Sequence, residues 1–311
     1  MEKLTMIITI RFNDLSLSLS VRCLCGVSVC EYERMNELIA ACVQVETRLE
    51  SDMEAAYLDG DNTGMTATDT QKNSVYYVVK HDKPETAMGL ALGVAKLMLD
   101  RYARVSGVRV RVIERPWVRA DGHRHGFVLQ EGDGDREAVV VKRRSSVSAS
   151  AGVIGMTVLK STQSGYEGFL RDDLTLLPDT RERVLASSVT ARFDIANPTY
   201  LDRYDAIVTG AIAAMKERFF GDEVKGVYSP SVQFTLHKMA SAVLDRVPET
   251  SAVTMSMPNI HFLPMHNERI GISFDDDVYV ATSEPHGTIE ASVVRRRNPP
   301  PTSATLPLAR L

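Results

Sequence analysis

Asn259 and His261 stand two residues apart in the apolar run 255–264 (Met-Ser-Met-Pro-Asn-Ile-His-Phe-Leu-Pro). In a strand, successive side chains point to opposite faces, so this amide and this imidazole would share one face while Ile260 points the other way. One interpretation is a strand end whose polar pair bonds to loop backbone. The other is a preorganised pair that faces a ligand, and the remaining polar segments of the chain have to decide between the two.

The segment 66–73 (Thr-Ala-Thr-Asp-Thr-Gln-Lys-Asn) is the first of three further concentrations of polar residues. It precedes the apolar run 74–80, which we predict to be a strand, so one interpretation is a solvated turn. The functional interpretation is a loop that presents hydroxyl groups, among them that of Thr68, and the Asp69 carboxylate to a polar ligand.

The second concentration runs from 158 to 172 and continues to Arg183. Gly165 and Gly168 flank Tyr166, so a tight loop can hold an aromatic ring there without crowding. Arg183 precedes an apolar strand and can reach over the same space. The alternative is that the aromatic ring only caps a core.

The third concentration, 231–234 (Ser-Val-Gln-Phe), stands at a predicted helix start, with Ser229 and Pro230 as its cap and first turn. The free backbone N–H groups of a first helical turn can meet an acceptor. Gln233 adds a donor and an acceptor side by side. An ordinary capped helix start explains the same residues.

The cysteines raise the question of a metal site. A zinc cluster is conceivable, but their spacing fits no common pair-of-pairs pattern, and alternating Cys23 and Cys25 are typical of small apolar strand residues. We therefore predict no metal and a reduced, intracellular protein. The four cysteines are Cys23, Cys25, Cys30 and Cys42.

The composition limits the classes of protein to consider. A chain of 311 residues has room for one large or two ordinary domains. A net charge of −4 gives no reason to expect nucleic acid or an anionic membrane as the main partner. No apolar run approaches the roughly 18 residues that span a bilayer. Nothing resembles a G-x-G-x-x-G or P-loop phosphate cradle, which argues against a nucleotide cofactor.

Hydrophobic periodicity predicts two halves with the same order of elements, joined by a low-complexity connection over 145–150. Strands grouped together and helices grouped together favour an α+β fold with antiparallel sheets over alternating βαβ units. The predicted strands are 38–56, 74–80, 108–112, 138–141, 155–160, 184–193, 252–262, 278–282 and 287–295, and the predicted helices are 84–105, 203–220 and 231–246.

We divide the chain into four parts. Residues 1–45 are a divergent N-terminal segment with the first strand, 46–143 a first domain and 144–296 a second domain. Residues 297–311 form a Pro-rich tail, predicted to be disordered, that ends in Ala309-Arg310-Leu311.

Several motifs in order resemble the urate oxidase (uricase) family, over about residues 50–295. Because the motifs are independent of one another, their common order makes coincidence a poor explanation. The motifs are 60–76 (GDNTGMTATDTQKNSVY), 123–127 (HRHGF), 157–172 (TVLKSTQSGYEGFLRD) with 183–185 (RVL), 258–261 (PNIH) and 285–290 (PHGTIE).

The resemblance implies a tandem pair of tunnelling-fold (T-fold) domains, each an antiparallel sheet with helices on one face. It implies a homotetramer with sites at the subunit interfaces. The implied reaction is the oxidation of urate by O₂ to 5-hydroxyisourate and H₂O₂, with no metal or organic cofactor. Peroxide production gives a purpose to Ala309-Arg310-Leu311, a variant of the Ser-Lys-Leu peroxisomal address, so we predict a peroxisomal protein that binds the import receptor.

The resemblance also implies roles for individual residues. Tyr166 stands where the family has a Phe that stacks on urate, and Arg183 matches the Arg that grips the carbonyl edge of the anion. Gln233, beside the Val232 backbone, matches the amide that pairs with the opposite edge.

The other implied roles concern oxygen and protons. Asn259 would hold O₂, and later the attacking water, above the purine plane. His261 and Thr68 would belong to a proton relay. Thr68 and Asp69 match the pair that approaches the ligand from a neighbouring subunit. His123 and His125 could suggest a metal, but the family uses none, and packing at an interface is the preferred interpretation.

One departure from the family pattern bears on catalysis. The family's relay begins with a Lys in a Gly-Lys-x-x-Val-Arg context, and alignment on Val21-Arg22 puts Leu17 and Ser18 at the Gly and Lys positions. Loss of a general base typically lowers a rate by a factor of about 10²–10⁴. The alternative functions are therefore a catalytically impaired, urate-binding T-fold tetramer, or a related enzyme acting on another purine or pterin.

Overall fold

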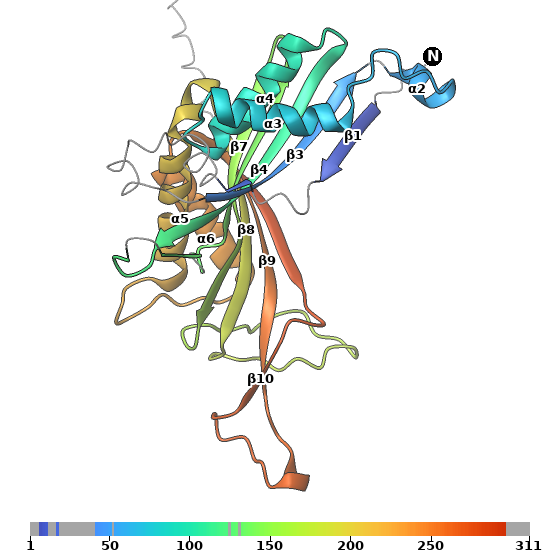
Figure 1. Cartoon of the computed structure of the whole chain (residues 1–311). Helices are drawn as coiled ribbons and strands as arrows, with labels where there is room; N and C mark the ends of the chain where they lie inside the picture. Colours follow the sequence, from blue (N-terminus) through green and yellow to red (C-terminus); the bar gives the residue numbers. More distant parts are fainter. Residues whose placement is uncertain are drawn as a thin grey trace, which may run out of the picture.

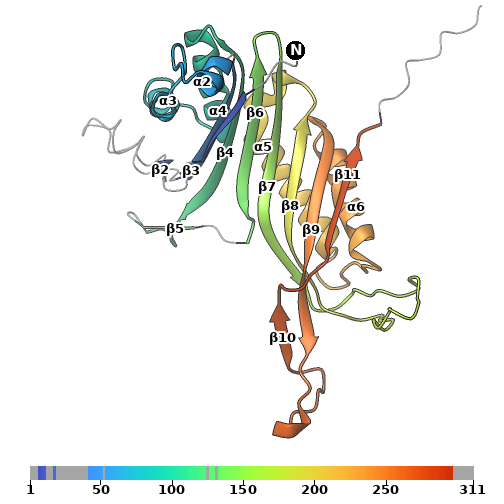
Figure 2. The same ribbon diagram turned by 90° about the vertical axis from the view of Figure 1, so that its right-hand side faces the viewer.

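A single antiparallel sheet runs through the molecule and carries the helices on one face (Figures 1 and 2). The computed structural model describes residues 6–11, 17–18, 41–51, 53–123, 126–129 and 132–296. Within these ranges the sheet has eleven strands, and its main path runs β1-β3-β4-β6-β7-β8-β9-β10. The predicted α+β class with antiparallel sheets is confirmed.

The bounds of the elements are as follows. The strands are β1 (Met6–Arg11), β2 (Leu17–Ser18), β3 (Ala41–Ser51), β4 (Val105–Arg119), β5 (Phe127–Leu129), β6 (Asp135–Arg143), β7 (Val147–Lys160), β8 (Leu185–Ile195), β9 (Thr250–Pro264), β10 (Tyr279–Thr282) and β11 (Thr288–Val294). The helices are α2 (Glu54–Leu58), α3 (Thr68–His81), α4 (Ala87–Arg101), α5 (Tyr204–Phe220) and α6 (Val232–Arg246), with short 3₁₀ turns η2 (Pro198–Arg203) and η3 (Glu268–Ile270).

The two halves of the chain repeat one pattern, which is strands, then helices, and then three more strands. In the first half α4 packs on β4 and β6, and in the second half α6 packs on β9 and β11. An arginine after the last strand of each half donates to backbone carbonyls around the end of the preceding helix pair. Arg144 donates to the carbonyls of Tyr102, Ala103 and Val105, and Arg295 donates to those of Leu244, Val247 and Thr250.

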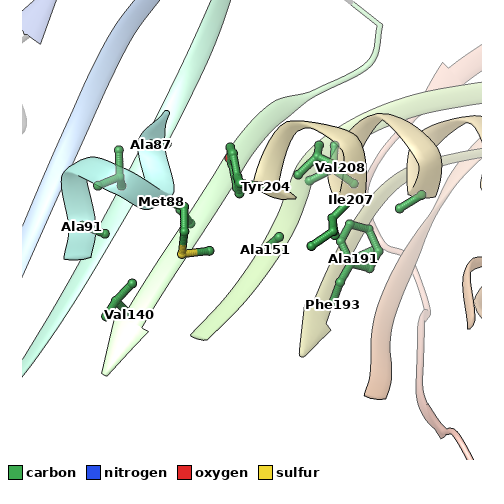
Figure 3. Packing of buried hydrophobic residues seen from close by; sticks show 14 of the residues in the cluster. Ala87, Met88, Ala91, Val140, Ala151, Ala191, Phe193, Tyr204, Ile207 and Val208 are labelled. Atoms are coloured by element: carbon green, nitrogen blue, oxygen red, sulfur yellow. The ribbon is translucent and has the colours of Figure 1, made fainter. Parts of the chain in front are cut away.

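One hydrophobic core lies between the sheet and the helices of both halves. Figure 3 shows Met88 of α4 and Tyr204 of α5 pointing onto the same face of the sheet, against strand residues such as Ala151 and Phe193. These side chains are fully buried. Burial of this continuous apolar layer fixes the position of each strand end that carries a polar site residue.

The structure corrects four of the predicted segments. The run 74–80 belongs to helix α3, because its buried positions recur at helical spacing although valines favour strands. The segment 66–73 is therefore mostly the first part of that helix and not a loop. The predicted strand 38–56 is wrong after Ser51, since α2 begins at Glu54. Most of the predicted connection 145–150 belongs to strand β7.

Some predictions fall on residues outside the described ranges: those for Cys23, Cys25, Cys30, His125 and the tail 297–311. Among the helices of the described ranges, none combines the length and the apolar character that a membrane crossing requires.

Candidate functional site

The long loop between β7 and β8 is tied to the start of α6 by backbone hydrogen bonds. The Gly165 N–H donates to the Ser229 carbonyl at 2.9 Å, and the Ser229 N–H donates to the Gln163 carbonyl at 2.9 Å. Within the loop, Tyr166 and Thr180 exchange two hydrogen bonds of 2.7 and 3.0 Å. The segment that carries Tyr166 is therefore held by a ladder and not by side-chain contacts alone.

Arg183 reaches across this loop toward Tyr166. Its backbone N–H donates to the Ser164 carbonyl at 2.9 Å, and its guanidinium carbon lies 5.5 Å from the centre of the Tyr166 ring. The Nε–H group is buried and has no hydrogen-bond partner within the described part of the chain. An unsatisfied buried donor of this kind destabilises a structure by roughly 1–3 kcal/mol, so it is well placed to receive a ligand oxygen.

Burial also lowers the pKa of the Arg183 guanidinium, while Tyr166 and Tyr228 act in the opposite direction. An arginine pKa lies so far above neutrality that the group stays charged. The site therefore presents a permanent, partly desolvated cation. An anion with a planar oxygen-bearing edge would satisfy both the charge and the free donor.

Tyr166 does not present both faces of its ring in this conformation. Phe169 stacks on it with ring centres 4.7 Å apart and an interplanar angle of 8°. A flat ligand on Tyr166 would therefore use the face that Arg183 approaches or displace Phe169. Sequence inspection missed Phe169 as a neighbour of the site, although it belongs to the motif that contains Tyr166.

The start of α6 supplies a second polar edge. Ser231, and not the predicted Ser229, caps the helix by accepting a hydrogen bond from the Phe234 N–H at 3.1 Å, and Pro230 lies before the first turn. Val232 is buried, whereas Gln233 in the first turn is exposed and its side-chain amide is available to a ligand. The isolated bridge between Ser164 and Ser229 joins this edge to the Arg183 loop.

Asn259 and His261 lie in strand β9, which confirms that they belong to one strand and alternate with Ile260. Asn259 pairs with Ser187 of β8, and its N–H donates to the Gly287 carbonyl at 3.0 Å. His261 pairs with Thr282 of β10. Both residues are half-buried. They continue the row of Val253, Met255 and Met257, whose side chains are buried against the helices.

Thr68 and Asp69 lie in the first turn of α3, and both are exposed. Lys72, at 2.9 Å from the carboxylate, holds the pKa of Asp69 below its ordinary value, with a further contribution from the Asn73 amide. Figures 1 and 2 show α3 and the loop between β7 and β8 at opposite ends of the sheet. One chain therefore gathers Tyr166, Arg183 and the α6 start into one neighbourhood, but it does not bring Thr68 and Asp69 there.

Two other predicted positions lie apart from this neighbourhood. Leu17 and Ser18, at the register of the family's Gly and Lys, form β2 and pair with Val43 and Cys42 of β3. His123 lies in the turn between β4 and β5. Among the residues that the structure describes, no group of three or more His, Cys, Asp and Glu side chains is arranged to hold a metal ion.

A duplicated antiparallel sheet with two helix pairs on one face, and a polar site at the strand ends, defines a tandem T-fold protein. Comparison with known proteins then places the chain within that class. The uricase family model matches residues 17–140 and 149–290. The chain belongs to the uricase family. The match includes residues 17–45, which form most of the N-terminal segment predicted to be divergent.

Relatives and solved structures agree with this assignment. The chain is 42% identical over 266 residues to Uricase-2 of Phaseolus vulgaris, covering 81% of this chain and 86% of that protein. It is 40% identical over 256 residues to a uricase of Arabidopsis thaliana, covering 78% and 82%. The crystal structure of uricase from Arthrobacter globiformis superimposes with a TM-score of 0.76 at 28% identity, covering 96% of this chain and 94% of that chain.

We predict that Gly165→Ala displaces the loop that carries Tyr166. A Cβ at this position would meet the Tyr228 hydroxyl, and it would lie 2.8 Å from the Thr180 carbonyl oxygen, which cannot move without breaking the ladder. The variant should lower the free energy of unfolding by about 1–3 kcal/mol, measured by urea denaturation.

Gly287→Ala is the matched control, because its nearest non-local atom would be the Asn259 amide nitrogen at 3.8 Å, an ordinary contact distance. Equal stability of the two variants would contradict the assigned packing of the loop.

Proposed function

We propose that this chain is a urate oxidase, which oxidises urate with O₂ and water to 5-hydroxyisourate and H₂O₂. Membership of the uricase family supports the reaction. Within the site, the observation that carries the proposal is the buried Arg183 Nε–H, which has no partner among the described residues. A urate anion supplies the oxygen and the negative charge that this group lacks.

Three features of the site suit a flat purine. Arg183 offers two parallel N–H donors to the carbonyl edge. Tyr166 offers an aromatic face, and stacking of a base on such a ring is worth about 1–3 kcal/mol. Gln233 and the Val232 backbone N–H serve the opposite edge, in the manner in which Arg and Gln read purine edges in nucleic acids.

The chemistry requires oxygen and protons to be handled on one side of the purine. Urate gives up two electrons, O₂ takes them with two protons and leaves as H₂O₂, and a water oxygen becomes the 5-hydroxyl group. Asn259 holds first O₂ and then the water above the ring. His261, with Thr68, carries the protons. The rate gain comes from stabilising the electron-rich anion and positioning oxygen against it, without a metal or organic cofactor.

Thr68 and Asp69 reach the substrate from a neighbouring copy in a homotetramer. Their exposure at the start of α3, far from Arg183, supports a site shared between copies. Exposed apolar side chains support self-association. They include Leu170 (91% exposed) and Leu176 (93% exposed) on the β7–β8 loop and Ile270 (68% exposed) on the arm after β9.

The tail directs the enzyme to peroxisomes. Ala309-Arg310-Leu311 has the small–basic–Leu pattern of a peroxisomal address that an import receptor reads. Peroxisomal location would place peroxide formation beside catalase.

The test of this function is a stoichiometric assay. Purified protein, dialysed against a chelator, is mixed with urate and air, and urate absorbance, O₂ and peroxide are followed together. We expect one O₂ consumed and one H₂O₂ formed for each urate lost, at a rate that the chelator does not change. Tight urate binding without turnover would contradict the proposal and favour the impaired alternative, and loss of activity on chelation would contradict a cofactor-free reaction.

We predict that Arg183→Ala weakens urate binding by about 1–3 kcal/mol, because a bidentate contact to a purine edge is lost. Binding is measured without O₂, so that turnover does not intervene. Arg181→Ala is the matched control, since Arg181 is exposed and pairs with Glu167 at 2.9 Å instead of facing the site. The assigned contact between Arg183 and urate is wrong if both variants bind urate as tightly as the unmodified chain.

A further inference from the structure

A pocket of about 330 Å³ is lined by residues of α6, by Arg218 of α5, by Lys160 at the end of β7 and by Val227 and Tyr228 before α6. The two helices lie side by side along the sheet (Figure 1). A second hollow of about 220 Å³ shares Arg218, Ala242 and Asp245 with it and lengthens it between the helices. Volumes of a few hundred Å³ are typical of sites for small organic ligands.

The pocket is positively charged. The pocket is lined by three cationic side chains, those of Lys160, Arg218 and Lys238, and by one carboxylate, that of Asp245. The ion pairs that α5 and α6 make among the described residues join Arg136 to Asp205, Lys216 to Asp133 and Arg246 to Glu217, and neither Arg218 nor Lys238 takes part in one. Two cationic groups at the pocket are therefore available to an anion.

Lys160 has a more specific geometry than the two surface cations. Its ammonium group donates to the carbonyls of Phe219 at 3.1 Å and Val227 at 2.9 Å. An ammonium group has three donors, so one N–H remains for a ligand. Burial lowers the pKa of Lys160, and a bound anion would compensate for that loss of solvation.

Two half-exposed aromatic rings complete the lining, with Tyr228 43% exposed and Phe234 45% exposed. Lys238 lies 5.3 Å from the centre of the Phe234 ring, which keeps a cation beside an aromatic surface. Aromatic surfaces combined with a cluster of cations are the two elements with which proteins bind a base and its phosphate.

We propose that this pocket is a second ligand site, distinct from the urate site, which takes an aromatic monophosphate of nucleotide size. The phosphate contacts Lys160, Arg218 and Lys238, and the ring packs on Tyr228 and Phe234. None of Tyr166, Arg183, Gln233 or Asn259 lines the pocket. Ligand binding at this pocket requires no turnover of urate, so its test does not depend on the proposed function.

The test is isothermal titration calorimetry of the full chain with AMP as the probe, alongside adenosine and inorganic phosphate. We expect saturable binding of one AMP per chain, with adenosine and phosphate at least about tenfold weaker because each lacks one of the two elements. Saturating urate under anaerobic conditions should leave AMP binding unchanged. Displacement of AMP by urate would assign AMP to the urate site and overturn the proposal.

Three variants locate the site. Lys238→Glu should weaken AMP by about tenfold or more through loss and reversal of a charge contact. Phe234→Leu, which keeps the apolar volume, should weaken AMP more than phosphate. Lys225→Glu changes the same charge on an exposed residue of the neighbouring turn that does not line the pocket, and it should have less than about a twofold effect.

Two further results would overturn the proposal. One is the absence of saturable AMP binding by the unmodified protein. The other is an equal loss in Lys238→Glu and Lys225→Glu, which would indicate attraction by the whole surface and not by a pocket. Circular dichroism of each variant establishes that a loss of binding is not a loss of fold.

Discussion

The buried Nε–H of Arg183, which has no partner within the described part of the chain, is the constraint on which the rest of the site depends. A charged group held partly out of water without a partner is unfavourable, and it persists only where the surrounding structure leaves it no better arrangement. The backbone ladder through Ser164, Thr180 and Ser229 provides that restraint. Under the proposed function, this preorganised donor gains its partner when the urate anion binds, so that recognition requires little rearrangement of the protein.

The duplicated fold explains how such a loop is held. One continuous apolar core fixes the strands and helices of each half. Arg144 and Arg295 donate hydrogen bonds to backbone carbonyls near the ends of the two helix pairs in equivalent ways. The long β7–β8 loop can then leave the sheet and return to it without weakening the core. The start of α6 is anchored to the same loop at Ser229, so backbone hydrogen bonds hold the loop and the start of α6 together.

Much of this arrangement could be predicted from the sequence, because local patterns dictate it. The presence of helices α4 and α6, the alternation in β4 and the shared face of Asn259 and His261 follow from periodicity, whereas the N-caps are Thr86 and Ser231 and not the residues that the sequence suggested. Helix α3 was mistaken for a strand over 74–80 because Val75, Val78 and Val79 favour strands, and only their packing shows the helical spacing. The stacking of Phe169 on Tyr166 and the empty donor of Arg183 depend on contacts made in three dimensions, which no local pattern contains.

The central claim is that each site combines Arg183 of one chain with Thr68 of another. Its most direct test is complementation between Thr68→Ala and Arg183→Ala chains, each impaired alone, that are unfolded together in equal amounts and refolded. Random assembly should restore about a quarter of the unmodified sites, since a site is complete when each chain supplies its intact residue. A mixture of Arg183→Ala with Gln233→Ala, both on the same half of the site, should recover nothing. A Thr68→Ala and Arg183→Ala mixture no more active than the mean of the separate variants would contradict the shared site.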